Sequence, residues 1–338
     1  MPRIEETLRH LKQQAFTESL DWEIIIVDYR SSDGTLPLIK TFTQDNPDLK
    51  LRIIQIEAAG KTPAIEAGFW AAQSEVVCIV DDDNLVDKDY VQTAHETMKY
   101  RRDVGVIGAF GIAQISPNVQ VPEWFDFFEG KYAVGSQGDC RGYADNSRFY
   151  FWGAGSVFRR SAWIRAKKIG FEPILNPSRG TSADTFLQGF SGGEDPEMCL
   201  AIIMAGYKLW YEPSLRYRHL ISETRLTTKF LFNTTRGVSV TSPYLRLFLS
   251  YVIDQRPLKQ RVRTTIWRNI YLHFAYTVAL YIRLLAASLF AHEFRSIKLS
   301  ILWISAISEF RGLLLLLKSG RKLKARFHVM KFNSREIS

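Results

Sequence analysis

Short apolar runs alternate with segments of helical periodicity over the first 110 residues. Runs rich in β-branched residues predict strands at 23–28, 51–57, 76–80 and 104–110. Helix-like segments are expected at 3–14, 61–73 and 87–100, and a turn followed by a helix is expected within 33–46. Strands that alternate with helices of this length form crossover units. The pattern therefore predicts an α/β fold built on a mostly parallel sheet with helices on both faces.

The pattern becomes less regular beyond residue 115. Strands are expected near 148–151 and 156–158, in a stretch rich in Gly and aromatic residues. Residues 170–193 carry Gly, Pro, Ser and Thr without periodicity and predict a long loop, a feature that is usually functional in a compact domain. A helix is expected to open with acids at residue 194, with Pro196 in its first turn, and to close at Gly206 before two short strands.

Composition and charge divide the chain into two regions. The 338 residues are 46% hydrophobic and 23% charged, which is typical of a globular protein. The net charge of +9 comes from the C-terminal part, where residues 241–338 hold 17 Lys and Arg against 4 Asp and Glu. We therefore predict a main domain over 1–240, with halves at about 1–110 and 111–240, followed by a basic helical region over 241–338.

The cysteines and the N-terminus bear on the cellular compartment. The three cysteines have no metal-ligand spacing, so reduced and mostly buried thiols in a cytosolic compartment are expected. The N-terminus is polar and charged and does not resemble a signal peptide.

Two apolar segments, 264–290 and 296–318, lie in the basic region. A transmembrane helix needs about 20 nearly uncharged residues, and charged or polar residues interrupt both segments. The interrupting residues are His273, Arg283, Lys298, Glu309 and Arg311. At about 100° per residue, Arg261, Arg268 and Arg283 share one narrow stripe of a helix, with Thr265 near it.

This pattern predicts helices that lie in a membrane interface, with a polybasic segment at 318–331 attracted to anionic lipid. The alternative is that the helices pack on the main domain. Binding to nucleic acid is disfavoured, because the basic residues border long aliphatic runs.

Acidic residues follow apolar segments at three places, namely Asp28, Asp81 to Asp83, and Glu194 with Asp195. The carboxyl ends of strands are where α/β sheets bind ligands. Three adjacent carboxylates repel one another, and a divalent cation or open solvent relieves that repulsion. Each group also has an ordinary interpretation, as a turn cap, a solvated loop, or acids that complement a helix dipole.

Four segments occur in an order that resembles the family-2 inverting glycosyltransferases of bacterial type, which have the GT-A fold. The segments are EIIIVDYRSSDGT, GKTPAIEAGFWAAQSEVVCIVDDDN, WGAGSVFRRSAW and GGEDPEMCLAIIMAGYKLWYEPSLRYRH, and the resemblance runs from about residue 4 to residue 235. Two features depart from the family pattern. The opening strand of the family is not recognisable, and the acid that commonly follows Asp28 is replaced by Tyr29.

The resemblance implies roles for residues on the donor side. Asp83, with Asp81 and His219, would bind Mg²⁺ or Mn²⁺, since carboxylate oxygens select these ions. The nucleotide and its diphosphate would contact residues from three segments. These are Asp28, Tyr29, Lys61, Asp81 and Asp82. Lys61 is equally consistent with a solvated side chain, and a lone histidine such as His219 is often structural.

On the acceptor side, Asp195 would act as general base and Glu194 would orient the acceptor or the helix start. Trp152 would offer a stacking surface, while Gly153 and Gly155 would let a sugar approach the backbone. A core tryptophan beside a tight strand explains the same residues. Arg225 and Arg236 would face phosphates or solvent.

The expected activity is metal-dependent, inverting transfer of a sugar from a nucleotide-diphosphate sugar, UDP-linked by analogy, to a hydroxyl of a lipid-linked or polysaccharide acceptor. The basic region places the expected enzyme at the cytoplasmic face of the cell membrane, in synthesis of cell-envelope polysaccharide. Two alternatives remain open. One is a nucleotidyltransferase, which also uses acids on an α/β sheet. The other is a catalytically silent membrane scaffold, because the opening strand is missing.

Overall fold

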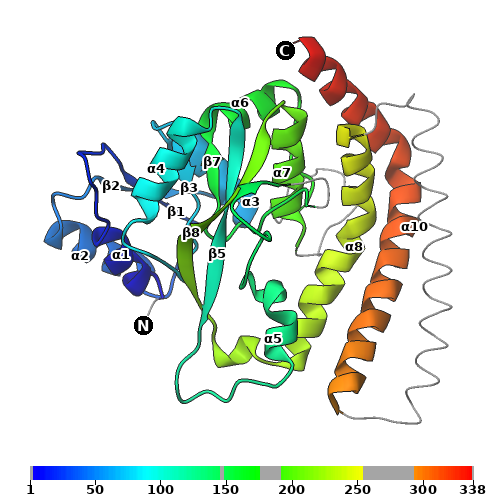
Figure 1. The fold of residues 1–338 in the computed structure, drawn as a ribbon, viewed down its shortest axis with the longest axis horizontal. Coiled ribbons are helices and arrows are strands. Elements are labelled where there is room, and N and C mark those ends of the chain that lie inside the picture. Colours follow the sequence, from blue (N-terminus) through cyan, green and yellow to red (C-terminus); the bar gives the residue numbers. More distant parts are fainter. Residues whose placement is uncertain (1–2, 145–147, 176–191, 254–292, 337–338) are drawn as a thin grey trace.

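A computed structural model describes residues 3–144, 148–175, 192–253 and 293–336. A central sheet carries helices on its faces, and two long C-terminal helices stand side by side at one end of the molecule (Figure 1). The opposite end is formed by the N-terminal helices and a small two-stranded sheet.

The first half of the chain follows the predicted alternation of helices and strands. Its elements are α1 (Ile4–Lys12), β1 (Ile24–Asp28), α2 (Thr35–Asp45), β2 (Leu51–Gln55), α3 (Lys61–Ala71), β3 (Val76–Cys78), β4 (Asn84–Val86), α4 (Tyr90–Tyr100) and β5 (Val104–Gln114). The predicted helices and strands are confirmed within a few residues at each end, because amphipathic spacing and β-branched runs are local signals.

The second half has longer connections. Its elements are α5 (Phe125–Phe128), η1 (Glu129–Tyr132), β6 (Gly142–Tyr143), β7 (Val157–Arg159), α6 (Arg160–Lys168), α7 (Glu194–Met204), β8 (Lys208–Leu220), η2 (Glu223–Arg225), α8 (Thr228–Ile253) and α10 (Glu293–Glu336). The strand expected at 148–151 is wrong, since these residues are irregular. The two strands expected after α7 are one strand, β8. Most of the predicted loop at 170–193 lies outside the described residues.

The main sheet is mixed and not mostly parallel. Its order is β3-β7-β5-β8-β4, with β6 paired to β8. Only β5 and β8 run parallel in this sheet, and the other pairs are antiparallel. The prediction of parallel strands joined by a crossover helix holds for the separate pair β1 and β2. In the main sheet, β7 lies between β3 and β5 and runs antiparallel to both.

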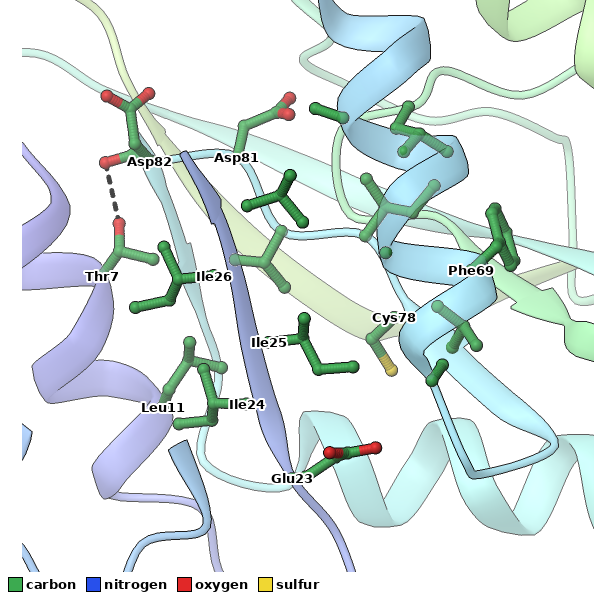
Figure 2. A pocket seen from close by; sticks show the side chains of 18 of the residues that line it. Thr7, Leu11, Glu23, Ile24, Ile25, Ile26, Phe69, Cys78, Asp81 and Asp82 are labelled. Atoms are coloured by element: carbon green, nitrogen blue, oxygen red, sulfur yellow. Dashed lines mark hydrogen bonds between the residues drawn. The ribbon is translucent and has the colours of Figure 1, made fainter. Parts of the chain in front are cut away.

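A cavity separates β1 from β3. Figure 2 shows Ile24, Ile25 and Ile26 of β1 on one side of this space and Cys78 of β3 on the other. The cavity has a volume of about 390 Å³ and is lined by Ile24 and Ile26 of β1, Val77 of β3, Phe69 of α3 and Leu11 of α1, among others. Among the described residues no strand occupies this space, so the sheet is split here.

The two long helices α8 and α10 pack closely against each other and the domain. A Cβ atom added to Gly312 of α10 would lie 2.2 Å from the backbone oxygen of Val240 in α8, so only glycine allows this approach. Arg246 and Glu309 form two hydrogen bonds between the helices, of 3.2 and 3.0 Å. The predicted boundary at residue 240 lies inside α8, which runs unbroken from Thr228 to Ile253.

Within α10, the segment Ser296–Ser319 is long and apolar enough to cross a membrane by length and composition alone. Its exposed apolar side chains recur at helical spacing, at Trp303, Ile307, Phe310, Leu314 and Leu317. The other predicted apolar segment, 264–290, and the arginine stripe of Arg261, Arg268 and Arg283 lie outside the described residues.

Candidate active site

The backbone of the acidic triplet is fixed by hydrogen bonds from several elements. The Ile79 amide donates to the Ser156 oxygen at 2.8 Å, and the Leu220 amide donates to the Asp83 oxygen at 2.9 Å. From α1, the Thr7 hydroxyl donates to the Asp82 backbone oxygen at 2.9 Å. Figure 2 shows Asp81 and Asp82 at one end of the cavity, beyond the end of β3. The carboxylates are therefore held at the predicted carboxyl end of this strand.

Each carboxylate of the triplet has a basic partner. Lys61 lies 3.1 Å from Asp81, and Arg3 lies 3.2 Å from Asp82. The Asp83 carboxylate receives two guanidinium groups, from Arg3 at 3.1 Å and from Arg225 at 3.1 Å. The mutual repulsion of the three acids is thus relieved by basic side chains from the starts of α1 and α3 and from η2.

The basic partners give Asp82 and Asp83 different pKa values, although the two acids are neighbours in the chain. Burial raises the pKa of Asp83, but His219, Arg225 and Arg3 outweigh burial, so its pKa is lowered overall. For Asp82, burial and the charges of Asp83 and Asp81 outweigh Arg3, and the pKa is raised. Asp83 therefore stays ionised at lower pH than its neighbour.

Lys61 connects the triplet to Asp195. Its ammonium group lies 3.1 Å from Asp81 and 4.0 Å from Asp195. Burial lowers the pKa of Lys61, but Asp81 and Asp195 outweigh it, so the pKa is raised and the amine stays charged. The start of α3 and the start of α7, which are more than a hundred residues apart, therefore meet at this edge of the sheet.

Glycine backbones shape the region around Asp195. A Cβ atom at Gly153 would lie 2.1 Å from Oδ1 of Asp195, so any larger residue would displace this carboxylate. Gly155 has a φ of +61°, and a Cβ atom there would lie 2.4 Å from the ring of Tyr217. The two predicted glycines thus have steric reasons to be glycine, one against the candidate base and one against a buried ring.

Trp152 precedes these glycines and is half-buried. Its amide donates to the Gln137 side chain at 2.6 Å, and the Gln137 amide group donates to the Ala109 oxygen of β5 at 2.8 Å. Gln137 is 1% exposed and therefore fixes the Trp152 backbone to the sheet.

Glu194 lies beside Asp195 at the start of α7, and both residues are partly buried. Its Oε2 atom is buried without a hydrogen-bond partner among the described residues. Burial, and then the charge of Asp195, raises the pKa of Glu194. A carboxyl group of this kind is suited to hydrogen bonding with an added polar group.

His219 lies next to Asp83, as the family resemblance implied. Its Nδ1 atom lies 2.6 Å from the Tyr132 backbone oxygen, so Nδ1 carries a hydrogen. Its Nε2 atom lies 3.4 Å from Oδ1 of Asp83 and 3.0 Å from Nη1 of Arg225. Among the described residues no three His, Cys, Asp or Glu side chains are grouped to hold a metal ion by themselves.

Asp28 and Tyr29 lie at the end of β1. The Asp28 carboxylate is buried and accepts the Ser31 amide at 3.4 Å, which also fits a structural turn. Tyr29 is 43% exposed and so is free to stack on a ligand. Arg236 hydrogen-bonds Asn233 on α8, while Arg225 is the arginine that reaches the triplet.

Sequence reasoning missed Arg3, Gln137 and Tyr217. Arg3 is a basic residue at a helix start, where the dipole disfavours a cation, and this was a usable signal. Tyr217 is fully buried, and burial followed by the charge of Asp81 raises its pKa. Its hydroxyl donates to the Ala133 oxygen at 2.5 Å. No local pattern distinguished it from other core aromatic residues.

The sheet, its acidic edge and the flanking helices define a protein of the GT-A fold. The structure is similar to the mannosyltransferase PcManGT from Pyrobaculum calidifontis in complex with GDP-Man and Mn²⁺, with a TM-score of 0.55 and 19% identity. The similarity covers 91% of this chain and 83% of that one. Residues 2–165 match the family model described as Glycosyl transferase family 2.

Two curated proteins of Trichomonas vaginalis are related in sequence. Dolichyl-phosphate beta-glucosyltransferase ALG5C is 27% identical over 99 residues, which are 29% of this chain and 29% of that protein. Dolichyl-phosphate beta-glucosyltransferase ALG5A is 30% identical over 97 residues, which are 28% and 30% of the two chains. The chain thus matches less than a third of the length of these relatives.

Proposed function

We propose that this protein is a glycosyltransferase that moves a sugar from a nucleotide-diphosphate sugar to an acceptor hydroxyl with inversion. The observation that carries the proposal is the bridge made by Lys61 between Asp81 and Asp195. It joins the acidic edge of the nucleotide-binding half to a separate carboxylate of the acceptor half. A single displacement would use one carboxylate group at the leaving diphosphate and another at the acceptor hydroxyl, and the two carboxylates near Lys61 support this assignment.

In the proposed reaction Asp195 accepts the proton of the acceptor hydroxyl as its oxygen attacks the anomeric carbon. The diphosphate leaves from the opposite face, so the configuration is inverted. Asp195 is 24% exposed and therefore reachable by an acceptor. Glu194 orients the acceptor with its free Oε2, and Trp152, Gly153 and Gly155 line the acceptor side.

The chemistry of the triplet fits a divalent cation. Mg²⁺ and Mn²⁺ are commonly bound by one or two carboxylates together with substrate phosphates, so a complete protein cage is not needed. The Arg3 guanidinium already stands as a cation between Asp82 and Asp83. Asp81 and Asp83, with His219 beside them, would hold the ion, which supplies positive charge for the diphosphate when bound.

The donor and acceptor classes are proposed from the family and the relatives. A UDP-sugar is the favoured donor by analogy. Asp28 and Tyr29 would contact its uracil ring, and Lys61 and Asp82 would lie near its phosphates. The matched relatives carry names that specify dolichyl phosphate, which supports a lipid-linked acceptor, and a polysaccharide acceptor is the second option.

A location at the cytoplasmic face of the cell membrane, in cell-envelope synthesis, accords with the basic C-terminal region. The apolar segment Ser296–Ser319 and its exposed Trp303 and Phe310 support contact with anionic lipid. Such contact would keep the acidic edge near an amphiphilic acceptor.

The proposal is tested by donor turnover. Full-length protein in lipid vesicles is incubated with Mn²⁺ and a panel of sugar nucleotides, and release of nucleoside diphosphate is measured. We expect turnover by the wild type to be lost in Asp195→Asn and in Asp83→Ala. The exposed Asp48→Asn, in the turn after α2, serves as the matched control and should retain wild-type turnover.

Other outcomes would contradict the proposal in different ways. Release of pyrophosphate that is insensitive to Asp195→Asn would indicate a nucleotidyltransferase. Identical background turnover in all four proteins would favour a silent membrane scaffold.

A further inference from the structure

The three basic partners of the acidic triplet are not equally fixed. The Arg3 side chain is 47% exposed, whereas Arg225 and Lys61 are 29% and 28% exposed. Arg3 also contacts two acids, since its two terminal nitrogens reach Asp82 and Asp83. Among these three partners it is therefore the most accessible cation, and it spans two carboxylates of the triplet itself.

The Asp83 carboxylate is enclosed by polar and basic side chains. Its Oδ2 atom accepts a hydrogen bond from Arg3 and forms an ion pair with Arg225, both at 3.1 Å. Its Oδ1 atom accepts the Asn84 side-chain amide at 3.2 Å, and the carboxylate side chain is 4% exposed. An added cation at Asp83 must therefore displace a donor and must overcome repulsion from the remaining guanidinium groups.

Arg225 and Asn84 are poor candidates for displacement. Arg225 lies 3.0 Å from His219 and packs over the ring of Phe230, with 6.0 Å to the ring centroid. Asn84 is fully buried in β4. Arg3, in contrast, begins a helix, where the dipole disfavours a positive charge, so moving its side chain into water is less costly.

The movement need not involve the helix itself. The Thr7 hydroxyl holds α1 to the Asp82 backbone oxygen at 2.9 Å, independently of Arg3. The Arg3 side chain can therefore leave while α1 stays in place.

We propose that Arg3 is a displaceable counter-cation that competes with a divalent metal ion for the Asp83 carboxylate. The inference rests on the metal use in the proposed function, and it adds a residue that sets the affinity of the site for the ion. The bound ion and the Arg3 side chain exclude each other at Asp83, which Arg3 contacts at 3.1 Å.

The test measures direct binding of Mn²⁺ to the full chain in the absence of any sugar nucleotide. Binding is quantified from the electron paramagnetic resonance signal of free Mn²⁺. We expect Arg3→Ala to bind Mn²⁺ about tenfold more tightly than the wild type, because a positive charge next to the ion is removed. The Arg3→Lys variant keeps a positive charge but cannot span both acids. Its affinity for Mn²⁺ should therefore lie between those of the wild type and Arg3→Ala. Arg9→Ala is the matched control, since Arg9 lies on the same helix and pairs with Glu5.

Equal affinity of the wild type and Arg3→Ala would overturn the proposal, as would weaker binding by Arg3→Ala in a protein that retains its wild-type unfolding temperature. Absence of Mn²⁺ binding in all variants would also overturn it. Donor turnover is measured on the same samples. Turnover by the wild type would then show that the glycosyltransferase function stands although the competition does not.

Discussion

Glu197 provides a test of the structure that does not depend on activity. It lies on α7 and is fully buried. Its carboxylate accepts the Ile174 amide at 3.0 and 3.1 Å and the Leu175 amide at 3.0 Å. The Tyr244 hydroxyl of α8 donates to it at 2.5 Å. One acid therefore joins α7, the segment before residue 176 and the C-terminal helices.

Burial raises the pKa of Glu197 from 4.5 to about 7, although the hydrogen bonds from Tyr244, Leu175 and Ile174 oppose it. Between these two pH values the folded protein binds a proton that the unfolded chain does not. The contribution to stability is therefore complete below about pH 4.5 and is lost as the pH rises through about 7. A pKa difference of this size corresponds to about 3 kcal/mol as an upper figure.

The perturbation is Glu197→Gln, and the assay is urea unfolding of the wild type and the variant between pH 5 and pH 8. Subtracting the two free energies of unfolding cancels the other titrating groups that the proteins share. We expect the difference to move by about 3 kcal/mol across this range, with the wild type relatively more stable at the acid end.

Tyr244→Phe keeps the acid and removes a donor to its charged form, so it should shift the transition to higher pH. A difference between wild type and Glu197→Gln that stays constant with pH would refute the reasoning. A shift to lower pH in Tyr244→Phe would refute it as well.

Three further predictions use other contacts. Gly153→Ala should lower kcat at least tenfold and cost about 1–3 kcal/mol in unfolding experiments, because its methyl group would overlap the Asp195 carboxylate; wild-type turnover would contradict this. Gly312→Leu should lower the unfolding temperature by forcing α10 away from the α8 backbone, and an unchanged Tm would count against that packing. At pH 8, iodoacetamide should label the exposed Cys140 faster than the partly buried Cys78, whose pKa is raised to about 12 by burial; equal labelling rates would contradict this prediction.

The sequence predicted β1, β2, β3 and β5 because each contains a short run rich in β-branched residues, but it missed the three-residue strand β4. It failed at β8, a single strand that contains Pro213 and that was expected as two short strands. The strand continues through a register shift, since Gly108 pairs with Tyr211 and Phe110 with Arg216. The intervening residues bulge out, which accommodates a proline that cannot donate a hydrogen bond to the sheet. A local pattern marks the proline but does not reveal the bulge.

The acidic residues of the candidate site could be predicted from the sequence, but the basic side chains that surround them could not. Asp81 to Asp83 follow a strand and so had to lie at a sheet edge. His219 reaches Asp83 because Asn84 pairs with His219 in the antiparallel register of β4 and β8, and this register is a tertiary property. Arg3 arrives from a third element.

Two adjacent acids consequently have opposite environments. Asp83 is enclosed by the strand pairing and by cations, whereas Asp82 is half exposed with Arg3 as its ion-pair partner. The pKa of one is lowered and that of the other is raised. Triplets of identical residues are indistinguishable in a sequence. Their division into an enclosed and an accessible carboxylate follows from the β4–β8 register, so a substitution that shifted this register would alter the site without changing any of its acids.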